Sequence, residues 1–290
     1  MPELPDLLSI TQHLQRRILN RRIVSATIHQ PVAIRNLLGE PPEDALRDLF
    51  FTRIDFHGPF LRLTLSSTVE IVVHLMLAGR IQHQVKGDHP LGFKIIALKL
   101  DDGTWLNICD EQKMAKIYIL HPGDYTPIPG FNEQGIDIRS PGFTEDVLRQ
   151  LAKQHSRKQV RVFINDHTIL SSIGNAYADE ILFAAKIHPK TIVASLSPAE
   201  LQGLYRAIGE VIEDGIRHVA GAGQPIHLKV RDHMKVRNRQ GLACPVCGTK
   251  IRREGVRGYD VFFCPACQPV RRKVFIDWSK PPGGENSAGA

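Results

Sequence analysis

The spacing of apolar residues predicts one helix at the start of the chain and a β-rich region after it. Over residues 3–19 apolar side chains recur at helical spacing, at Leu4, Leu7, Leu8, Ile10, Leu14 and Ile18. From residue 22 to 120 the pattern changes to short β-branched runs, and we expect strands at 23–29, 52–56, 60–65, 69–74, 94–100, 104–108 and 116–120. The pattern predicts a β-sandwich or barrel, interrupted by one short helix near 42–49.

The second half of the chain has a helical period. Residues 121–130 are rich in turn-forming residues and indicate a boundary. Beyond them we expect helices at 144–154, 156–165 and 175–185. Ser197-Pro198-Ala199-Glu200 is a capping box that opens a helix to about His218, and Gly221 to Gly223 end it.

Four cysteines near the C-terminus have the spacing of a zinc ribbon. Cys244 and Cys247 are separated by two residues, as are Cys264 and Cys267, with sixteen residues between the pairs. Such pairs form a closed four-thiolate site that leaves no coordination position for substrate, so one Zn²⁺ would be structural. The alternative is two disulfides. The fifth cysteine, Cys109, stands alone in an apolar strand pattern, which favours the zinc site.

Positive charge is concentrated around these cysteines. Residues 229–273 contain 12 Lys and Arg against 3 Asp and Glu, a net charge of +9. The totals of 37 and 30 then leave 25 basic against 27 acidic residues elsewhere. A solvated basic face is the plain alternative, but charge this localised on a small metal module favours a polyphosphate partner, with nucleic acid first.

We expect an α+β protein without a membrane partner. The predicted parts are an N-terminal helix plus β-sandwich domain at 1–125, a linker at 126–140, a helical domain at 141–228, the ribbon at 229–275 and a disordered tail at 276–290. No apolar run reaches membrane-spanning length and the N-terminus lacks the features of a signal peptide, so we expect a cytoplasmic monomer.

Three residues are candidates for chemistry. Removal of Met1 before the small residue Pro2 would leave a secondary amine with a pKa near neutrality, able to attack a sugar aldehyde, and Glu3 beside it could move protons. Alternatively, Pro2 is simply a proline at a helix entrance. Asn175 follows Gly174 at a helix start, where it could be an N-cap, a phosphate contact, or both.

The chain resembles the formamidopyrimidine-DNA glycosylase and endonuclease VIII family of bacterial base-excision repair enzymes up to about residue 273. The matching segments are Met1 to Pro5, His74 to Gly79, Ile173 to Pro189 and the ribbon ending at Gln268. The resemblance implies a β-sandwich domain, a helix-two-turn-helix domain and a zinc finger, with DNA between them.

It also implies roles for individual residues. The Pro2 amine would attack C1′ of a flipped-out damaged or abasic nucleotide, Glu3 would shuttle protons, and β/δ-elimination would cut the strand. Met76 matches the residue that fills the vacated space in the duplex, and Asn175 matches a phosphate contact.

The chain departs from the family pattern at several positions. The family's catalytic lysine aligns with Pro59, and Asp6 replaces a longer acid. Lys113 and Met114 stand where the family has Arg and Phe. In the ribbon, Tyr259 replaces the family arginine, and Arg257 two positions earlier is the remaining candidate for its phosphate contact. The short stretch from Gly223 to Gly241 leaves little room for the base-capping loop of the 8-oxoguanine-type enzymes, which favours the endonuclease VIII branch or a distinct subfamily.

Three functional hypotheses follow. The first is a DNA glycosylase with AP lyase activity, in which the lyase half is better supported because it depends chiefly on the amine and Glu3. The second is a catalytically impaired protein that binds damage or abasic sites, favoured by the changes at Pro59, Lys113 and Met114. The third, a transcription-type zinc ribbon on an unrelated N-terminal domain, leaves the four ordered matches unexplained.

Overall fold

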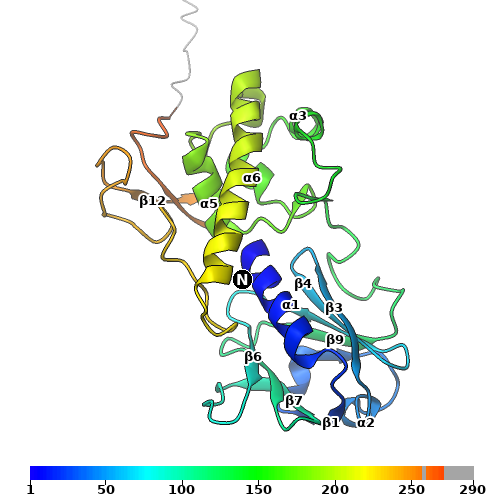
Figure 1. Ribbon diagram of the computed structural model, residues 1–290. Helices are drawn as coiled ribbons and strands as arrows, with labels where there is room; N and C mark the ends of the chain where they lie inside the picture. Colours follow the sequence, from blue (N-terminus) through cyan, green and yellow to red (C-terminus); the bar gives the residue numbers. More distant parts are fainter. Residues whose placement is uncertain (257–258, 271–290) are drawn as a thin grey trace, which may run out of the picture.

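The computed structural model describes residues 1–256 and 259–270, and its N-terminal half is a β-sandwich (Figure 1). One sheet has the order β1-β7-β8-β6 and the other β2-β9-β5-β4-β3. The strands are β1 (Ile23–Ile28), β2 (Ile34–Asn36), β3 (Phe51–His57), β4 (Phe60–Leu65), β5 (Glu70–His74), β6 (Arg80–Gln84), β7 (Lys94–Leu100), β8 (Trp105–Cys109) and β9 (Lys116–Leu120). All the expected strands are confirmed. The sequence pattern does not predict β2 and β6, because β2 has three residues and β6 is polar at every position except Ile81.

The sandwich core is formed by the facing apolar sides of the two sheets. Helix α1 (Leu4–Ile18) adds Ile10, Leu14 and Ile18 to this core, as its periodicity predicts. The short helix in the sandwich is α2 (Pro42–Ala45), which ends earlier than expected, and a 3₁₀ turn η1 (Pro31–Ala33) precedes β2.

Strand register brings three loops to one end of the five-stranded sheet. Phe60 of β4 pairs with both His57 of β3 and His74 of β5, and His74 also pairs with Lys116 of β9. The β3–β4 turn, the turn after β5 and the loop before β9 therefore leave the sheet at the same end.

The helical half lies beyond that end of the sandwich (Figure 1). It contains α3 (Glu145–Gln154), α4 (Val160–Ile164), α5 (Asn175–Ala184), a 3₁₀ turn η2 (Val193–Ser195), α6 (Pro198–Gly221) and a short parallel pair of β10 (Ile136–Asp137) with β11 (Leu170–Ser171). Helices α5 and α6 pack closely where Tyr177 of α5 meets Gly215 of α6. A Cβ added to Gly215 would lie only 2.4 Å from the Tyr177 ring, so this contact requires glycine. Within the described residues, no helix combines the length and apolarity needed to cross a bilayer.

Helix α1 joins the two halves. Its first residue, Leu4, packs in the core of the helical half, while Leu14 and Ile18 pack in the sandwich. The N-terminus consequently lies at the junction of the halves (Figure 1). The segment expected to be a linker is packed as well, because Ile128 and Phe131 contact the cluster around Phe60.

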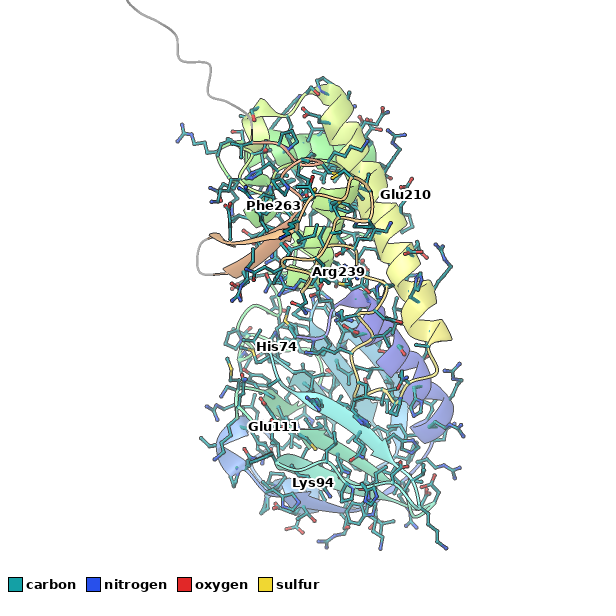
Figure 2. All side chains as sticks on the ribbon, turned by 90° about the vertical axis from the view of Figure 1, so that its left-hand side faces the viewer. His74, Lys94, Glu111, Glu210, Arg239 and Phe263 are labelled. Atoms are coloured by element: carbon teal, nitrogen blue, oxygen red, sulfur yellow. The ribbon has the colours of Figure 1, made fainter. Side chains whose placement is uncertain are left out.

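The C-terminal hairpin packs against α5 (Figure 2). Its strands, β12 (Arg252–Val256) and β13 (Tyr259–Phe263), are antiparallel. Buried Gln268 donates to Ile187 O (2.9 Å) and accepts from Cys264 N (3.0 Å), which fixes the ribbon to the helical half.

Candidate active site

Glu3 connects the beginning of the chain to helix α5. Its carboxylate accepts hydrogen bonds from Ala176 N (2.8 Å) and Tyr177 N (3.0 Å). These amides lie in the first turn of α5, which no side chain of its own caps. Helix N-termini expose unpaired N–H groups and favour negative charge. Glu3 therefore caps α5 from 173 residues away in sequence.

Gly174 provides the space that Glu3 occupies. A Cβ at Gly174 would lie 2.4–2.7 Å from atoms of the Glu3 side chain. The Gly174 φ of −97° is one that any residue adopts, so the requirement for glycine here is steric.

A second acid orients the first turn of α1. Asp6 accepts a bond from Glu3 N (2.8 Å) and two from the Arg231 guanidinium (2.9 and 2.6 Å). Arg231 also lies over the ring of Tyr177, at 5.7 Å from its centroid. Asp6 thus ties the segment that enters the ribbon to the N-terminus.

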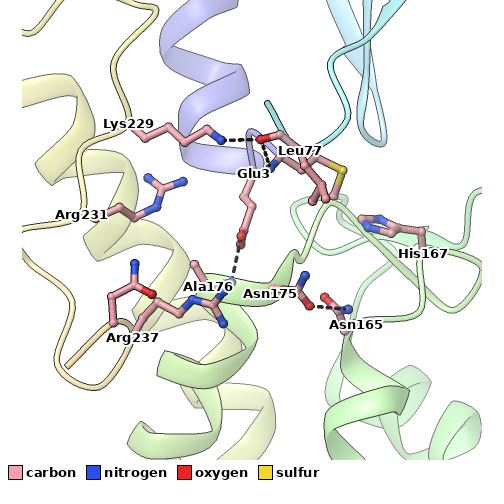
Figure 3. A pocket seen from close by; sticks show the side chains of 11 residues that line it. Glu3, Leu77, Asn165, His167, Asn175, Ala176, Lys229, Arg231 and Arg237 are labelled. Carbon is pink, nitrogen blue, oxygen red and sulfur yellow. Dashed lines mark hydrogen bonds between the residues drawn. The ribbon is translucent and has the colours of Figure 1, made fainter. Parts of the chain in front are cut away.

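A cavity of about 420 Å³ lies at this junction (Figure 3). Its walls include the N-terminus (Met1, Glu3), the turn after β5 (Leu77), the start of α5 (Asn175, Ala176), His167, and the segment leading to the ribbon (Lys229, Arg231, Arg237). All three parts of the chain contribute to this site.

The α-amine of the chain is in the cavity wall. Met1 N donates to Leu77 O at 3.1 Å. Burial, and after it the positive charge of Lys229, lower the pKa of this amine to about 5 from its ordinary value of 8.0. An amine at this position is therefore unprotonated at neutral pH, which is its nucleophilic form.

Asn175 lines the cavity without capping α5 through its side chain. Its Oδ1 accepts from buried Arg161 (2.8 Å), which is itself held by Asp179 (3.0 Å). Its amide nitrogen donates to no group in the described part of the chain. The structure thus leaves the Asn175 NH₂ group for an acceptor outside the protein.

Met76 and Met114 lie on rigid loops at the same end of the sheet. Met76 has φ +49° in a turn where a Cβ on Gly79 would lie 2.3 Å from Leu75 O. In the loop before β9, the buried Asp110 carboxylate accepts from three backbone N–H groups, including Met114 N at 2.8 Å. This loop exposes Lys113 and leaves Met114 half-buried.

The β3–β4 turn presents no cation. Pro59 is buried, and Gly58, with φ +52°, lies against the Gln134 side chain. His57 hydrogen-bonds with Phe131 O (3.0 Å), and Arg62 is engaged by Glu70 and the Tyr125 hydroxyl. Both basic side chains near Pro59 are therefore held inside the N-terminal domain.

The four ribbon cysteines form a zinc site. Their Sγ atoms lie within 4.8 Å of one another, with Cys244 to Cys267 at 3.8 Å and Cys247 to Cys264 at 3.4 Å. Tetrahedral Zn–S bonds of about 2.3 Å require separations near these values. Cys244 and Cys264 Sγ also accept backbone N–H bonds at 3.4 Å. The donor set fits one structural Zn²⁺.

The other ribbon candidate, Arg257, lies outside the described residues.

Sequence models of one family match all three parts of the chain. The formamidopyrimidine-DNA glycosylase N-terminal domain matches residues 1–117, the H2TH domain of the same enzyme matches 135–224, and the zinc finger found in FPG and IleRS matches 241–270. The formamidopyrimidine-DNA glycosylase of Symbiobacterium thermophilum is 32% identical, covering 95% of this chain and 92% of its own. That of Desulforamulus reducens is 30% identical, covering 93% and 100%.

The chain belongs to the formamidopyrimidine-DNA glycosylase family. Its fold matches the MutM (FPG) protein of Thermus thermophilus with a TM-score of 0.80 at 28% identity, over 92% of this chain and 98% of that one. It also matches Lactococcus lactis Fpg, solved with DNA containing an abasic site, with a TM-score of 0.83 at 21% identity over 93% and 100%, a likeness of fold alone. The relatives named here give no support to the endonuclease VIII branch that the short 223–241 stretch favours.

The predicted residues Glu3 and Asn175 both line this cavity, but the sequence pattern does not indicate several residues around them. Lys229 and Arg231 were recognised only as part of a basic region, although Asp6 and Arg231 form a specific ion pair. Arg161 lies in an apolar run, Val160 to Ile164, where a single buried arginine could have indicated a polar partner.

Gly174→Ala should displace the Glu3 carboxylate and destabilise the protein. We expect a loss of about 1–3 kcal/mol, the cost of leaving buried donors unpaired, in urea unfolding. The matched control is Gly203→Ala in α6, where a new Cβ meets nothing within 4 Å, so that helix propensity should stabilise the protein slightly. Equal effects of the two substitutions would contradict the steric requirement at Gly174.

Removal of zinc should unfold the ribbon and weaken DNA binding. Cys264→Ser, or treatment with a chelator, is expected to abolish one equivalent of bound zinc by elemental analysis and to lower affinity for a DNA duplex in a fluorescence anisotropy titration. Cys109→Ala changes a cysteine buried in β8 and should keep the full zinc content. Unchanged DNA affinity in the zinc-free protein would refute a structural role for the metal.

Proposed function

We propose that this protein is a base-excision repair DNA glycosylase with AP lyase activity. The observation that carries the proposal is the shared cavity of the α-amine and the Glu3 carboxylate at the junction of all three parts of the chain. Membership of the glycosylase family and the basic ribbon support DNA as the substrate. We assign 1–125 to the catalytic domain, 141–228 to the helix-two-turn-helix domain and 229–275 to the ribbon, and expect a monomer, because one chain completes the site.

The nucleophile would be the Pro2 amine after removal of Met1. Pro2 is buried between Met1 and Glu3, which both line the cavity, and we expect removal of Met1 to expose the Pro2 nitrogen at the cavity wall. We expect this amine to experience the same burial and the same neighbouring charge as the Met1 amine does, and to be unprotonated at pH 7.

The chemistry requires a nucleotide outside the helix. Once it is flipped into the cavity, the Pro2 nitrogen attacks C1′, and the base leaves with the glycosidic bond electrons. At an abasic site the amine adds to the C1′ aldehyde and loses one water to give an iminium. After base excision, the C1′–O4′ bond breaks and O4′ takes up a proton, which gives the same iminium. Loss of a C2′ proton then expels the 3′ phosphate, a second proton loss expels the 5′ phosphate, and hydrolysis frees the amine.

Glu3 would transfer protons in these steps. Each of its oxygens accepts one backbone N–H bond, which fixes the carboxylate while leaving further lone pairs toward the cavity. Its position next to Pro2 suits it to accept the amine proton and to protonate O4′ of the sugar as the C1′–O4′ bond breaks.

The other predicted residues would hold the DNA. We assign the free Asn175 NH₂ group to a backbone phosphate, beside the positive end of α5. Met76 and Met114 would enter the space left by the flipped nucleotide, and Lys113 would contact the opposite strand or its backbone. Arg257 keeps its predicted phosphate contact as a proposal from sequence.

A second candidate function is damage or abasic-site binding with impaired base excision. Its specific support is the buried, cation-free β3–β4 turn at Pro59. Tight binding to an abasic analogue without any strand scission would favour it over the lyase.

The lyase proposal predicts a covalent adduct that depends on a free Pro2 amine. We would prepare one protein with a cleavable N-terminal extension and compare it before and after cleavage to expose Pro2. Only the cleaved form should be trapped on abasic-site DNA by borohydride, at a rate that falls as the pH is lowered and the amine becomes protonated. Equal trapping of both forms, or no trapping of the cleaved form, would reject the assignment.

Glu3→Gln should impair both trapping and stability. The amide would place an N–H donor against one of the two α5 amides, so we expect a loss of about 1–3 kcal/mol in unfolding free energy besides slower scission. Comparing trapping at a temperature where both proteins are folded, by circular dichroism, separates the two effects. Wild-type scission by the folded variant would remove Glu3 from the mechanism.

A further inference from the structure

Three cations line the cavity, and two of them form ion pairs with acids. Arg231 forms its two bonds with Asp6, and Arg237 donates to Asp179 at 2.8 Å. Lys229 forms no ion pair within the described residues, and its Nζ donates only to Leu77 O, at 3.0 Å (Figure 3). Lys229 therefore brings uncompensated positive charge to the cavity.

The Lys229 ammonium and the α-amine of Met1, one residue before the Pro2 nitrogen, converge on the same acceptor. Leu77 O takes one bond from each, at 3.0 and 3.1 Å, so the two nitrogens lie within about 6 Å of each other. Leu77 belongs to the tight turn that Gly79 closes by donating to Leu75 O at 2.9 Å. This turn presents the Leu77 carbonyl to both basic groups.

The titratable groups around the Met1 amine act on its pKa in opposite directions. Glu3 and Asp6 raise the pKa of the amine, whereas burial and then Lys229 lower it. His74 has a pKa lowered to about 4, chiefly by burial, and burial also lowers the pKa of His167, so both are neutral at pH 7.

The Lys229 side chain is also available to substrate. The residue is exposed, and within the described residues its ammonium is hydrogen-bonded only to the Leu77 carbonyl. The ammonium can therefore exchange that bond for a charge-assisted bond to a phosphate. The β3–β4 turn offers no such group, because its residues Gly58 and Pro59 carry no charge.

We propose that Lys229 is a catalytic residue, which keeps the terminal amine nucleophilic by electrostatic repulsion and pairs with a phosphate beside the flipped nucleotide. This inference rests on the proposed function. In this chain the cation would come from the segment that enters the ribbon, whereas the family's catalytic lysine would lie in the β3–β4 turn, at the position of Pro59.

Two measurements on Lys229→Gln and Lys229→Arg test the proposal. The first is the pH dependence of α-amine acetylation in the free protein with Pro2 exposed, followed by mass spectrometry of the N-terminal peptide. Lys229→Gln should move the midpoint up by about one pH unit, because a like charge has been removed, whereas Lys229→Arg should keep it near wild type. The control Lys99→Gln removes an exposed charge from β7 and should leave the midpoint unchanged.

The second measurement is the salt dependence of binding to a duplex with a tetrahydrofuran abasic analogue. Loss of one phosphate contact should reduce the slope of log affinity against log salt by about 0.9 in Lys229→Gln but not in Lys229→Arg. Thermal unfolding verifies that each variant is folded.

The outcomes separate the two proposals. A Lys229→Gln midpoint and slope both equal to wild type would overturn the role of Lys229, whatever the enzyme does to DNA. Failure of the wild-type protein to form any borohydride adduct would instead overturn the lyase function, while a shifted midpoint and reduced slope would still support the electrostatic role of Lys229.

Discussion

The bond between the Glu3 carboxylate and the first turn of α5 is the interaction on which the site depends. It fixes the N-terminus at the boundary between the sandwich and the helical half, where a chain end would otherwise be poorly ordered. Because Glu3 is held at both oxygens, the Met1 amine two residues before it is placed against Leu77 O in the cavity wall. The same carboxylate caps the helix and, in the proposed mechanism, transfers protons, and the missing side chain of Gly174 leaves room for it.

Helix α5 connects this site to the zinc ribbon through consecutive acids. Its first turn binds Glu3, and one turn later Asp179 and Glu180 face the segment leading to the ribbon. Glu180 accepts backbone bonds from three successive residues, 235–237, while Asp179 holds Arg161 and Arg237. The zinc site therefore does more than fold a small module. The ribbon packs against the helix that Glu3 caps, and the segment that leads to it carries Lys229 and Arg231 past the amine.

Local patterns in the sequence predicted most of the fold, and failed where tertiary contacts decide. The β-branched runs and the capping box at Ser197 are local signals, and the structure confirms the elements they predicted. Strand β6 is polar and is paired only through β8, so no local signal marks it. At the site, Glu3 and Asn175 were predicted but their partners were not, because Ala176, Arg161 and Arg231 reach them across long sequence separations. Asn175 was weighed as a local N-cap, a role that Glu3 fills from a distance.

A double-mutant cycle between Glu3 and Gly174 tests the central claim most directly. The free energy of unfolding would be measured for wild type, Glu3→Ala, Gly174→Ala and the double variant. If Gly174 is required only to accommodate Glu3, the alanine at 174 costs about 1–3 kcal/mol beside Glu3 and close to nothing beside Ala at position 3, a coupling of at least about 1 kcal/mol. An equal cost of Gly174→Ala in both backgrounds would contradict the account.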